Sequence, residues 1–139
     1  MRSPLYSWAP SFVGSMAQDV EMNCPNLYRD IPEPARDEVF ESLIQTRHLK
    51  LERIISKGHA TPPGKWYDED SEEWVLLLKG SAGLLFEGET EVQVMGPGDT
   101  LHIPSHRRHR VEWTDPEKET IWLALHYHGT RDNNDETGL

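Results

Sequence analysis

Residues 73–80 read EWVLLLKG and residues 98–110 read GDTLHIPSHRRHR, and these two stretches decide the fold. Each holds a short apolar run that stops at a residue favouring a turn, Gly80 in the first and Pro104 in the second. Similar runs separated by turn residues surround them, at 81–87, 90–95, 109–114 and 120–128. Strands spaced about ten residues apart, with no helix between them, indicate an antiparallel sandwich or barrel.

Two further patterns precede these strands. In residues 49–55, Leu49, Leu51, Arg53 and Ile55 share one face, a largely apolar alternation that predicts another strand. Residues 34–46 instead place apolar side chains at helical spacing, with a proline and acidic residues near the start, as the first turn of a helix favours. The side chains in this pattern are Pro34, Asp37, Glu38, Val39, Phe40, Glu41, Leu43 and Ile44. The sequence therefore predicts one amphipathic helix packed outside an all-β barrel.

The length of 139 residues allows one domain with one hydrophobic core. We expect a disordered N-terminal extension at 1–21, a helical segment at 22–48, the barrel at 49–128 and a disordered tail at 129–139. Residues 1–21 lack the continuous apolar centre of a signal peptide, and no apolar run is long enough to span a bilayer. We therefore expect a cytoplasmic protein.

The charge balance excludes several partners. The chain has 14 Lys and Arg residues against 24 Asp and Glu residues, a formal net charge of −10. General nucleic-acid binding needs a surplus of basic residues facing phosphates, and attraction to an anionic membrane needs the same surplus. The single cysteine, Cys24, excludes an intrachain disulfide and a cysteine-cluster zinc site. The expected partner is a small molecule.

The acidic stretch WYDEDSEEW, residues 66–74, is the first candidate site. It holds five acids within positions 68–73, whose mutual repulsion is relieved either by solvent, as in an exposed loop, or by a bound cation. Glu73 shares the parity of Val75 and Leu77, so it points inward if that face of the strand is interior. A buried carboxylate needs a metal or a basic partner.

Histidines supply the second candidate site. His109 opens a strand on the face of Val111 and Trp113, and His106 lies in the preceding turn. A neutral imidazole there is a good metal ligand, although a histidine cluster beside so many arginines also fits a surface patch that pairs with acids. His126, in the last strand, faces either the cavity or a structural partner.

The two motifs resemble those of small single-domain cupins. The run from Glu73 to Gly80 fits the first cupin motif, a glutamate followed by six residues and a glycine. The run from Gly98 to Pro104 fits the start of the second motif, in which His106 then stands at a glycine position, His109 at the histidine position and Trp113 at the asparagine position. The resemblance implies a double-stranded β-helix, a barrel similar to a jelly roll.

One departure from the cupin pattern concerns the metal. Metal-dependent cupins place a His-x-His pair shortly before the glutamate, where this chain has Trp66, Tyr67 and Asp68. The resemblance carries over only two ligands, Glu73 and His109, and we propose Asp68 and His106 as substitutes for the others. Such a set suits a divalent transition metal, Zn, Mn, Fe or Ni. The side chains expected to line the pocket or bind the ligand are Trp66, Tyr67, Arg108, Arg110, Trp113 and His126.

The resulting hypothesis is a metallo-cupin that binds a small polar or acidic compound, with oxygenase, isomerase and lyase activities as the catalytic options. The alternative is a cupin without metal or catalysis, acting as a ligand sensor or a dimeric structural module, since one fold hosts both kinds. Trp74, Leu76 and Leu78 make the second face of the 73–79 strand apolar, so we expect cover from the helix or from a second subunit in a homodimer.

Overall fold

The computed structural model describes residues 24–128, so the disorder predicted at 1–21 and 129–139 lies outside the described residues. Two units divide the chain after Asp30. In the described part of the first unit, the Asn26 side chain accepts a hydrogen bond of 2.8 Å from the backbone N–H of Tyr28 and so fixes a local turn. The remainder concerns residues 31–128.

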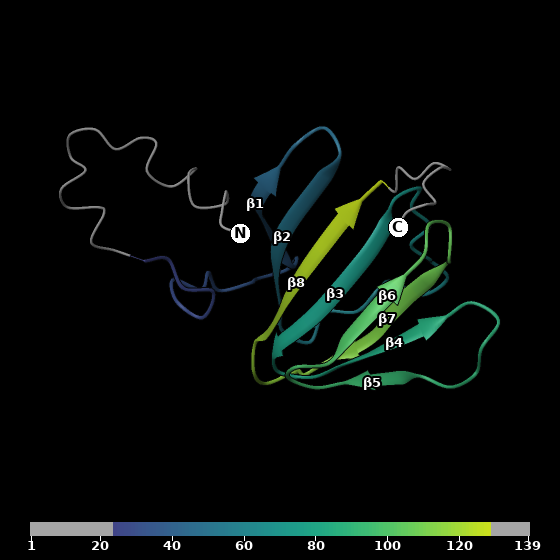
Figure 1. Cartoon of the computed structure of the whole chain (residues 1–139). Helices are drawn as coiled ribbons and strands as arrows, with labels where there is room; N and C mark the ends of the chain where they lie inside the picture. The colour runs from purple at the N-terminus through teal and green to yellow at the C-terminus, as the bar shows by residue number, and fades with distance from the viewer. Residues whose placement is uncertain (1–23, 129–139) are drawn as a thin grey trace. The chain divides into compact units, whose positions relative to one another are not determined.

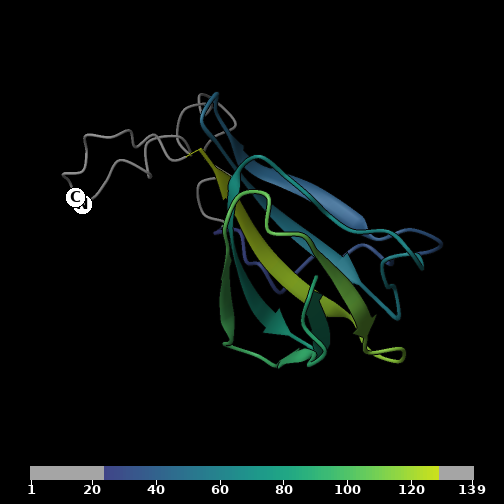
Figure 2. The ribbon, with the colours of Figure 1, turned by 90° about the vertical axis from the view of Figure 1, so that its right-hand side faces the viewer.

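Eight antiparallel strands form two sheets, which confirms the all-β prediction. The strands are β1 (Val39–Gln45), β2 (Leu49–Ser56), β3 (Glu72–Lys79), β4 (Ala82–Phe86), β5 (Gln93–Met95), β6 (Thr100–Ile103), β7 (His109–Thr114) and β8 (Thr120–Tyr127). The larger sheet has the order β1-β2-β8-β3-β6 and the smaller one β5-β4-β7. Figures 1 and 2 show β2, β8 and β3 side by side from two directions.

The prediction of a helix at 34–46 is wrong, because Val39–Gln45 forms strand β1. This strand pairs antiparallel with β2, with an irregularity between Ser42 and Ile44. A tight turn joins the two strands, in which the backbone N–H of Thr46 donates to the carbonyl of Leu49 at 2.9 Å. A short helix gains little stability by itself, whereas the β-branched residues Val39 and Ile44 suit a strand, and pairing with β2 extends from Val39 to Gln45 apart from that irregularity.

The core lies between the two sheets. Its buried side chains come from both, and they are Val75, Leu77, Ala82, Leu84, Met95, Ile103, Trp122 and Ala124. Val75 and Leu77 therefore face inward, as predicted, and Glu73 shares their side of β3. The strand parity argument correctly oriented the residue on which the site depends.

The opposite face of the larger sheet is also apolar. Trp74 pairs with Leu125 and Leu76 with Leu123, and Leu51 continues the first of these rows on β2. These side chains are only partly buried, and the predicted helix that would have covered them is not formed. Homodimerisation through this face stays a prediction, which sedimentation equilibrium at high protein concentration would test. Within residues 24–128 there is no helix long and apolar enough to cross a bilayer.

Two turn positions explain the sequence motifs. Gly80 ends β3 with φ of 95°, and a Cβ atom there would collide with the side chain of Thr120. Only glycine meets both conditions, so the glutamate motif must end in glycine. His106 has φ of 61°, in the left-handed region, and it stands where the cupin pattern places a glycine. His106 thus occupies a backbone conformation that is energetically unfavourable for a residue with a Cβ atom.

Candidate functional site

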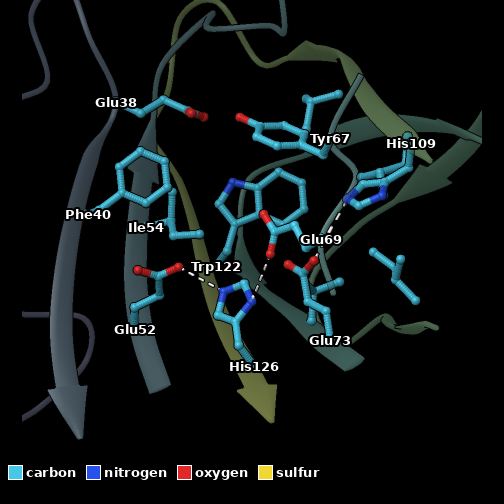
Figure 3. A pocket seen from close by; sticks show the side chains of 14 residues that line it. Glu38, Phe40, Glu52, Ile54, Tyr67, Glu69, Glu73, His109, Trp122 and His126 are labelled. Atoms are coloured by element: carbon cyan, nitrogen blue, oxygen red, sulfur yellow. Dashed lines mark hydrogen bonds and ion pairs between the residues drawn. The ribbon is translucent and has the colours of Figure 1, made fainter. Parts of the chain in front are cut away.

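A cavity of about 100 Å³ opens on the inner face of the larger sheet (Figure 3). Its lining combines apolar walls with acids and two histidines: Glu38, Phe40, Glu52, Ile54, Tyr67, Glu69, Glu73, Val75, Leu84, Ile103, His109, Val111, Trp122 and His126. No lysine or arginine belongs to this set of described residues. The volume is sufficient for a hydrated cation or for part of a small ligand.

Strand register brings the charged residues together. His126 of β8 pairs with Lys50 of β2 on one side and with Glu73 of β3 on the other, so the three side chains form one row across the sheet. Glu52 lies two residues along β2 from Lys50 and therefore points to the same inner side. The polar face of β2 thus lines the cavity, while its leucine-rich face looks away from it.

His126 contacts two glutamates of the site, one through each ring nitrogen. Its Nε2 atom lies 2.9 Å from Glu52 Oε2, and its Nδ1 atom lies 3.5 Å from Glu69 Oε1 (Figure 3). Hydrogen bonds with Glu52 and then Glu69 raise the pKa of His126 to about 10, against the opposing effect of burial. The same contact with His126 holds the pKa of the Glu69 carboxyl below its ordinary value. The imidazole is therefore a cation at neutral pH.

Glu52 is the most deeply buried partner in this group. Burial raises the pKa of its carboxyl, but the hydrogen bond with His126 and the charge of Lys50 outweigh burial and leave the pKa below its ordinary value. Glu52 is therefore an anion held in place by His126 and, at 3.5 Å, by the ammonium group of Lys50. Removing His126 would take away the nearer of the two positive charges that balance the Glu52 carboxylate.

Glu73 faces the cavity with only 12% of its side chain exposed. Burial raises the pKa of its carboxyl to about 7, since the charge of His126 lowers the pKa less than burial and the neighbouring glutamates raise it. Its Oε1 atom lies 3.7 Å from His109 Nε2 (Figure 3). Glu73 is thus a carboxylate whose charge lacks full compensation from the described residues.

His109 is oriented by backbone contacts. Its Nδ1 atom lies 2.9 Å from the carbonyl oxygen of Arg107, a contact that requires the proton to sit on Nδ1. Burial lowers the pKa of His109, so the ring is neutral and its Nε2 lone pair points toward Glu73. Tyr67 fixes the ring from above by exchanging backbone hydrogen bonds with His109 and stacking on it at 5.5 Å. A carbonyl acceptor behind an imidazole is the usual support of a histidine that binds a metal.

The donor atoms fit a divalent cation. One ligand atom each from Glu69, Glu73 and His126 lies within 4.8 Å of the others. His109 adds a second imidazole beside Glu73. A metal that binds His126 displaces a proton from the imidazolium, so Glu52, Glu69 and Glu73, when ionised, then carry three negative charges, of which a divalent cation neutralises two.

The structure separates the predicted ligands into two groups. Glu73 and His109 line the cavity together with Tyr67 and His126. Asp68 and His106 do not: they pair with each other at 2.9 Å, with 46% and 67% of their side chains exposed. The reason is alternation, since Tyr67 and Glu69 point inward and Asp68 between them points out.

The remaining predicted pocket residues lie outside the cavity lining. Arg108 pairs with Glu87 at 3.0 Å. Arg110 pairs with Glu112 at 2.8 Å and lies over the ring of Trp66. Trp113 packs against Gly83, where a Cβ atom would collide with the indole. These side chains support β7 and the loop before β3, and the two arginines are engaged there rather than aimed into the cavity.

Sequence reasoning missed Glu69 and Glu52. Glu69 carried a usable signal, because it shares the parity of Glu73 and Tyr67 within the acidic stretch. Glu52 carried a misleading one, because the leucine-rich face of its strand suggests the interior. In a sheet whose outer face is also apolar, the polar face can be the one that lines the site.

Comparison with known proteins identifies the family. The cupin domain family (Cupin_2) matches residues 52–126, more than half of the chain, so the chain belongs to this family. No protein among curated sequences matches it. The expected cupin double-stranded β-helix is thereby confirmed as the fold class, apart from the helix.

Solved structures agree. A protein of Ralstonia eutropha JMP134, named "a putative mannose-6-phosphate isomerase", is 51% identical, with a TM-score of 0.74 over 77% of this chain and 99% of that one. A cupin superfamily protein of Desulfitobacterium hafniense DCB-2 is 16% identical, with a TM-score of 0.59 over 70% and 84% of the two chains. An RmlC-like cupin of Methanocaldococcus jannaschii is 18% identical, with a TM-score of 0.56 over 71% and 87%. The last two support the fold alone.

Proposed function

We propose that this protein is a metallo-cupin that holds a divalent transition metal in the acidic cavity and binds a small hydroxylated compound there. The observation that carries the proposal is the convergence of Glu69, Glu73 and His126, whose ligand atoms lie within 4.8 Å of one another on the inner face of the barrel. Carboxylate and imidazole donors together suit Mn, Fe, Zn and Ni. His109, beside Glu73, offers a fourth donor.

The chain's own residues give the site its selectivity. A bound divalent cation supplies Lewis-acid polarisation of a carbonyl or hydroxyl oxygen. Ile54, Val75 and Trp122 form apolar walls that limit water in the cavity. The carboxylate of Glu38 and the hydroxyl of Tyr67 point toward one another across the cavity and are placed to orient ligand hydroxyls (Figure 3).

Isomerisation is the reaction class we favour among the three expected from the sequence. The support is the Ralstonia protein, which is 51% identical over nearly its whole length and whose name includes an isomerase. Interconversion of a hydroxyl and a neighbouring carbonyl needs a polarised oxygen and a nearby base. The carboxylates that line this cavity are candidates for that base.

The competing function is a ligand-binding cupin without metal. One observation favours it: protonated His126 already lies between Glu52 and Glu69 and neutralises part of their charge. In this alternative the imidazolium takes the role of the cation, and the cavity binds a polar ligand through its carboxylates.

Metal analysis of protein purified without chelator separates the two functions. We expect close to one equivalent of a transition metal in the wild type, and strong loss in Glu69→Gln and His126→Ala. The matched controls are Asp68→Asn and His106→Ala, which carry the same chemistry outside the cavity and should retain the metal. Metal content well below one equivalent in the wild type, or equal content in all five proteins, contradicts the metal proposal.

A further inference from the structure

A second cavity, of about 190 Å³, lies next to the first. It forms where the turn between β1 and β2, the end of β8 and the start of β3 meet, and Figure 1 shows these three segments at the same end of the larger sheet. Its lining is polar and consists of Gln45, Thr46, Arg47, His48, Leu49, Lys50, Asp70, Ser71, His126 and His128.

The charge of this second cavity is opposite to that of the first. Its charged side chains are Arg47 and Lys50 against a single carboxylate, Asp70, and three histidines lie beside them, in a chain whose formal net charge is −10. Among residues 24–128, neither Arg47 nor His48 has an ion-pair partner, and Lys50 contacts Glu52 only at 3.5 Å. Positive charge is therefore available to a ligand.

Local hydrogen bonds fix the turn between β1 and β2, which carries Arg47 and His48. The Thr46 hydroxyl accepts the backbone N–H groups of His48 and Leu49, at 3.1 and 3.2 Å. The backbone N–H of His128 donates to the carbonyl of His48 at 3.1 Å, which ties the turn to the end of β8. The backbone of the turn that carries Arg47 is thereby fixed at the edge of the cavity, which reduces the entropy cost of binding.

The two cavities share His126. Along β8, His128 lies two residues beyond His126, a separation of about 7 Å in a strand. Lys50 is in register with His126, so it stands in the same row as Glu73 of the acidic cavity. A ligand of a few carbon atoms can therefore reach from the basic cavity to the acidic one.

We propose that the basic cavity is a phosphate subsite, and that the ligand of the acidic cavity is a small hydroxylated phosphate ester such as a sugar phosphate. This assignment rests on the proposed function and names its substrate class. A phosphate offers three oxygens to the forked guanidinium of Arg47, the ammonium of Lys50 and the imidazoles of His48 and His128. The glutamates of the first cavity repel that anion, so it is the hydroxylated end that points inward.

The test measures ligand binding by calorimetry with two matched probes, D-mannose 6-phosphate and D-mannose, and with inorganic phosphate alone. We expect the phosphorylated sugar to bind at least about tenfold more tightly than mannose, since charge-assisted hydrogen bonds each contribute that much. Arg47→Gln should weaken binding of both phosphate and the sugar phosphate about tenfold. Arg36→Gln is the control, because it removes one exposed arginine that lines neither cavity.

The outcomes separate this proposal from the metal proposal. Phosphate binding that is lost in Arg47→Gln and kept in Arg36→Gln supports the subsite, and repeating the titration on Glu69→Gln shows whether it survives without the metal ligand. Equal affinity for mannose and its 6-phosphate, or equal weakening in both arginine variants, overturns the subsite whatever the metal content is. A second variant, His48→Gln, gives the same decision if Arg47→Gln does not fold.

Discussion

Two of the acid–imidazole pairs among the described residues involve neighbouring acids and differ in their surroundings. Asp68 and Glu69 are neighbours in the sequence, yet Asp68 pairs with exposed His106 at the rim, while Glu69 meets His126 on the inner face of the barrel. The exposed pair is the shorter, 2.9 Å against 3.5 Å. Only the inner pair shares its imidazole with a second, buried glutamate, Glu52, and only the inner pair lines a cavity.

The difference shows that distance is a poor guide to the importance of an ion pair. Water screens the rim pair, so each partner loses little when the other is removed. Burial isolates Glu52 and Glu73 from water, so their charges depend on His126 and on any bound cation. Substitutions of equal chemistry in the two pairs should therefore differ widely in effect.

The largest effect is expected from His126→Ala in metal-free protein. Loss of the imidazolium leaves the Glu52 carboxylate, 8% exposed, with Lys50 as its remaining ionic partner. We expect a loss of about 2–3 kcal/mol in the free energy of unfolding, measured by urea denaturation with chelator present. His106→Ala should change it by less than about 0.5 kcal/mol.

A second substitution distinguishes lost charge balance from lost packing. Adding Glu52→Gln to His126→Ala removes the unbalanced carboxylate and should recover part of the lost stability. If the double variant is less stable than His126→Ala by the full cost of Glu52→Gln alone, the two residues are independent and the inner pair is no more coupled than the rim pair.

The next effect is the pH dependence of stability in the metal-free protein. The pKa of Glu73 is raised from 4.5 to about 7 in the folded state, so its contribution is present below pH 4.5 and is lost as pH rises to about 7. The pKa of His126 is raised from 6.5 to about 10, so its contribution is lost only between those values. Stability should therefore fall as pH rises from 5 to 10, with the lowered pKa of His109 partly offsetting the contribution of Glu73 below pH 6.5.

Glu73→Gln isolates the first of these steps. The amide cannot ionise, so the fall in stability between about pH 5 and pH 7 should disappear while the fall at higher pH remains. At pH 8 the variant should be more stable than the wild type by about 1–2 kcal/mol in chelator. Asp68→Asn should leave the whole profile unchanged, and an equal change in both variants would remove the distinction between inner and rim acids.

On acidification below pH 4.5, protonation of Glu52 and Glu69 should destabilise every variant that retains them, since their pKa values are lowered in the folded state.

The same contrast shows what the sequence could and could not predict. Short runs ending at Gly80 and Pro104 predicted the strands, and the parity of Glu73 predicted its inward orientation, because alternation is a local property of the backbone. Segment 34–46 was misassigned because its spacing suits a helix and only pairing with β2 decides for a strand. Asp68 was proposed as a substitute ligand from its place in the motif. Glu69 was overlooked, and Glu52 was missed because its neighbours across the sheet come from distant parts of the sequence.

The smallest expected effect concerns the backbone under the rim pair. His106 holds φ of 61°, which costs a residue with a side chain about 1 kcal/mol relative to glycine. His106→Gly should therefore be more stable than His106→Ala by about that amount, although both lose the contact with Asp68. Urea denaturation of the two variants measures the difference directly. If alanine is as stable as glycine, the left-handed turn is not what makes glycine the cupin residue at this position. If His106→Gly is also more stable than the wild type, the pair of Asp68 and His106 stabilises the protein by less than the left-handed backbone of His106 destabilises it. The short distance between the two side chains then has no bearing on stability.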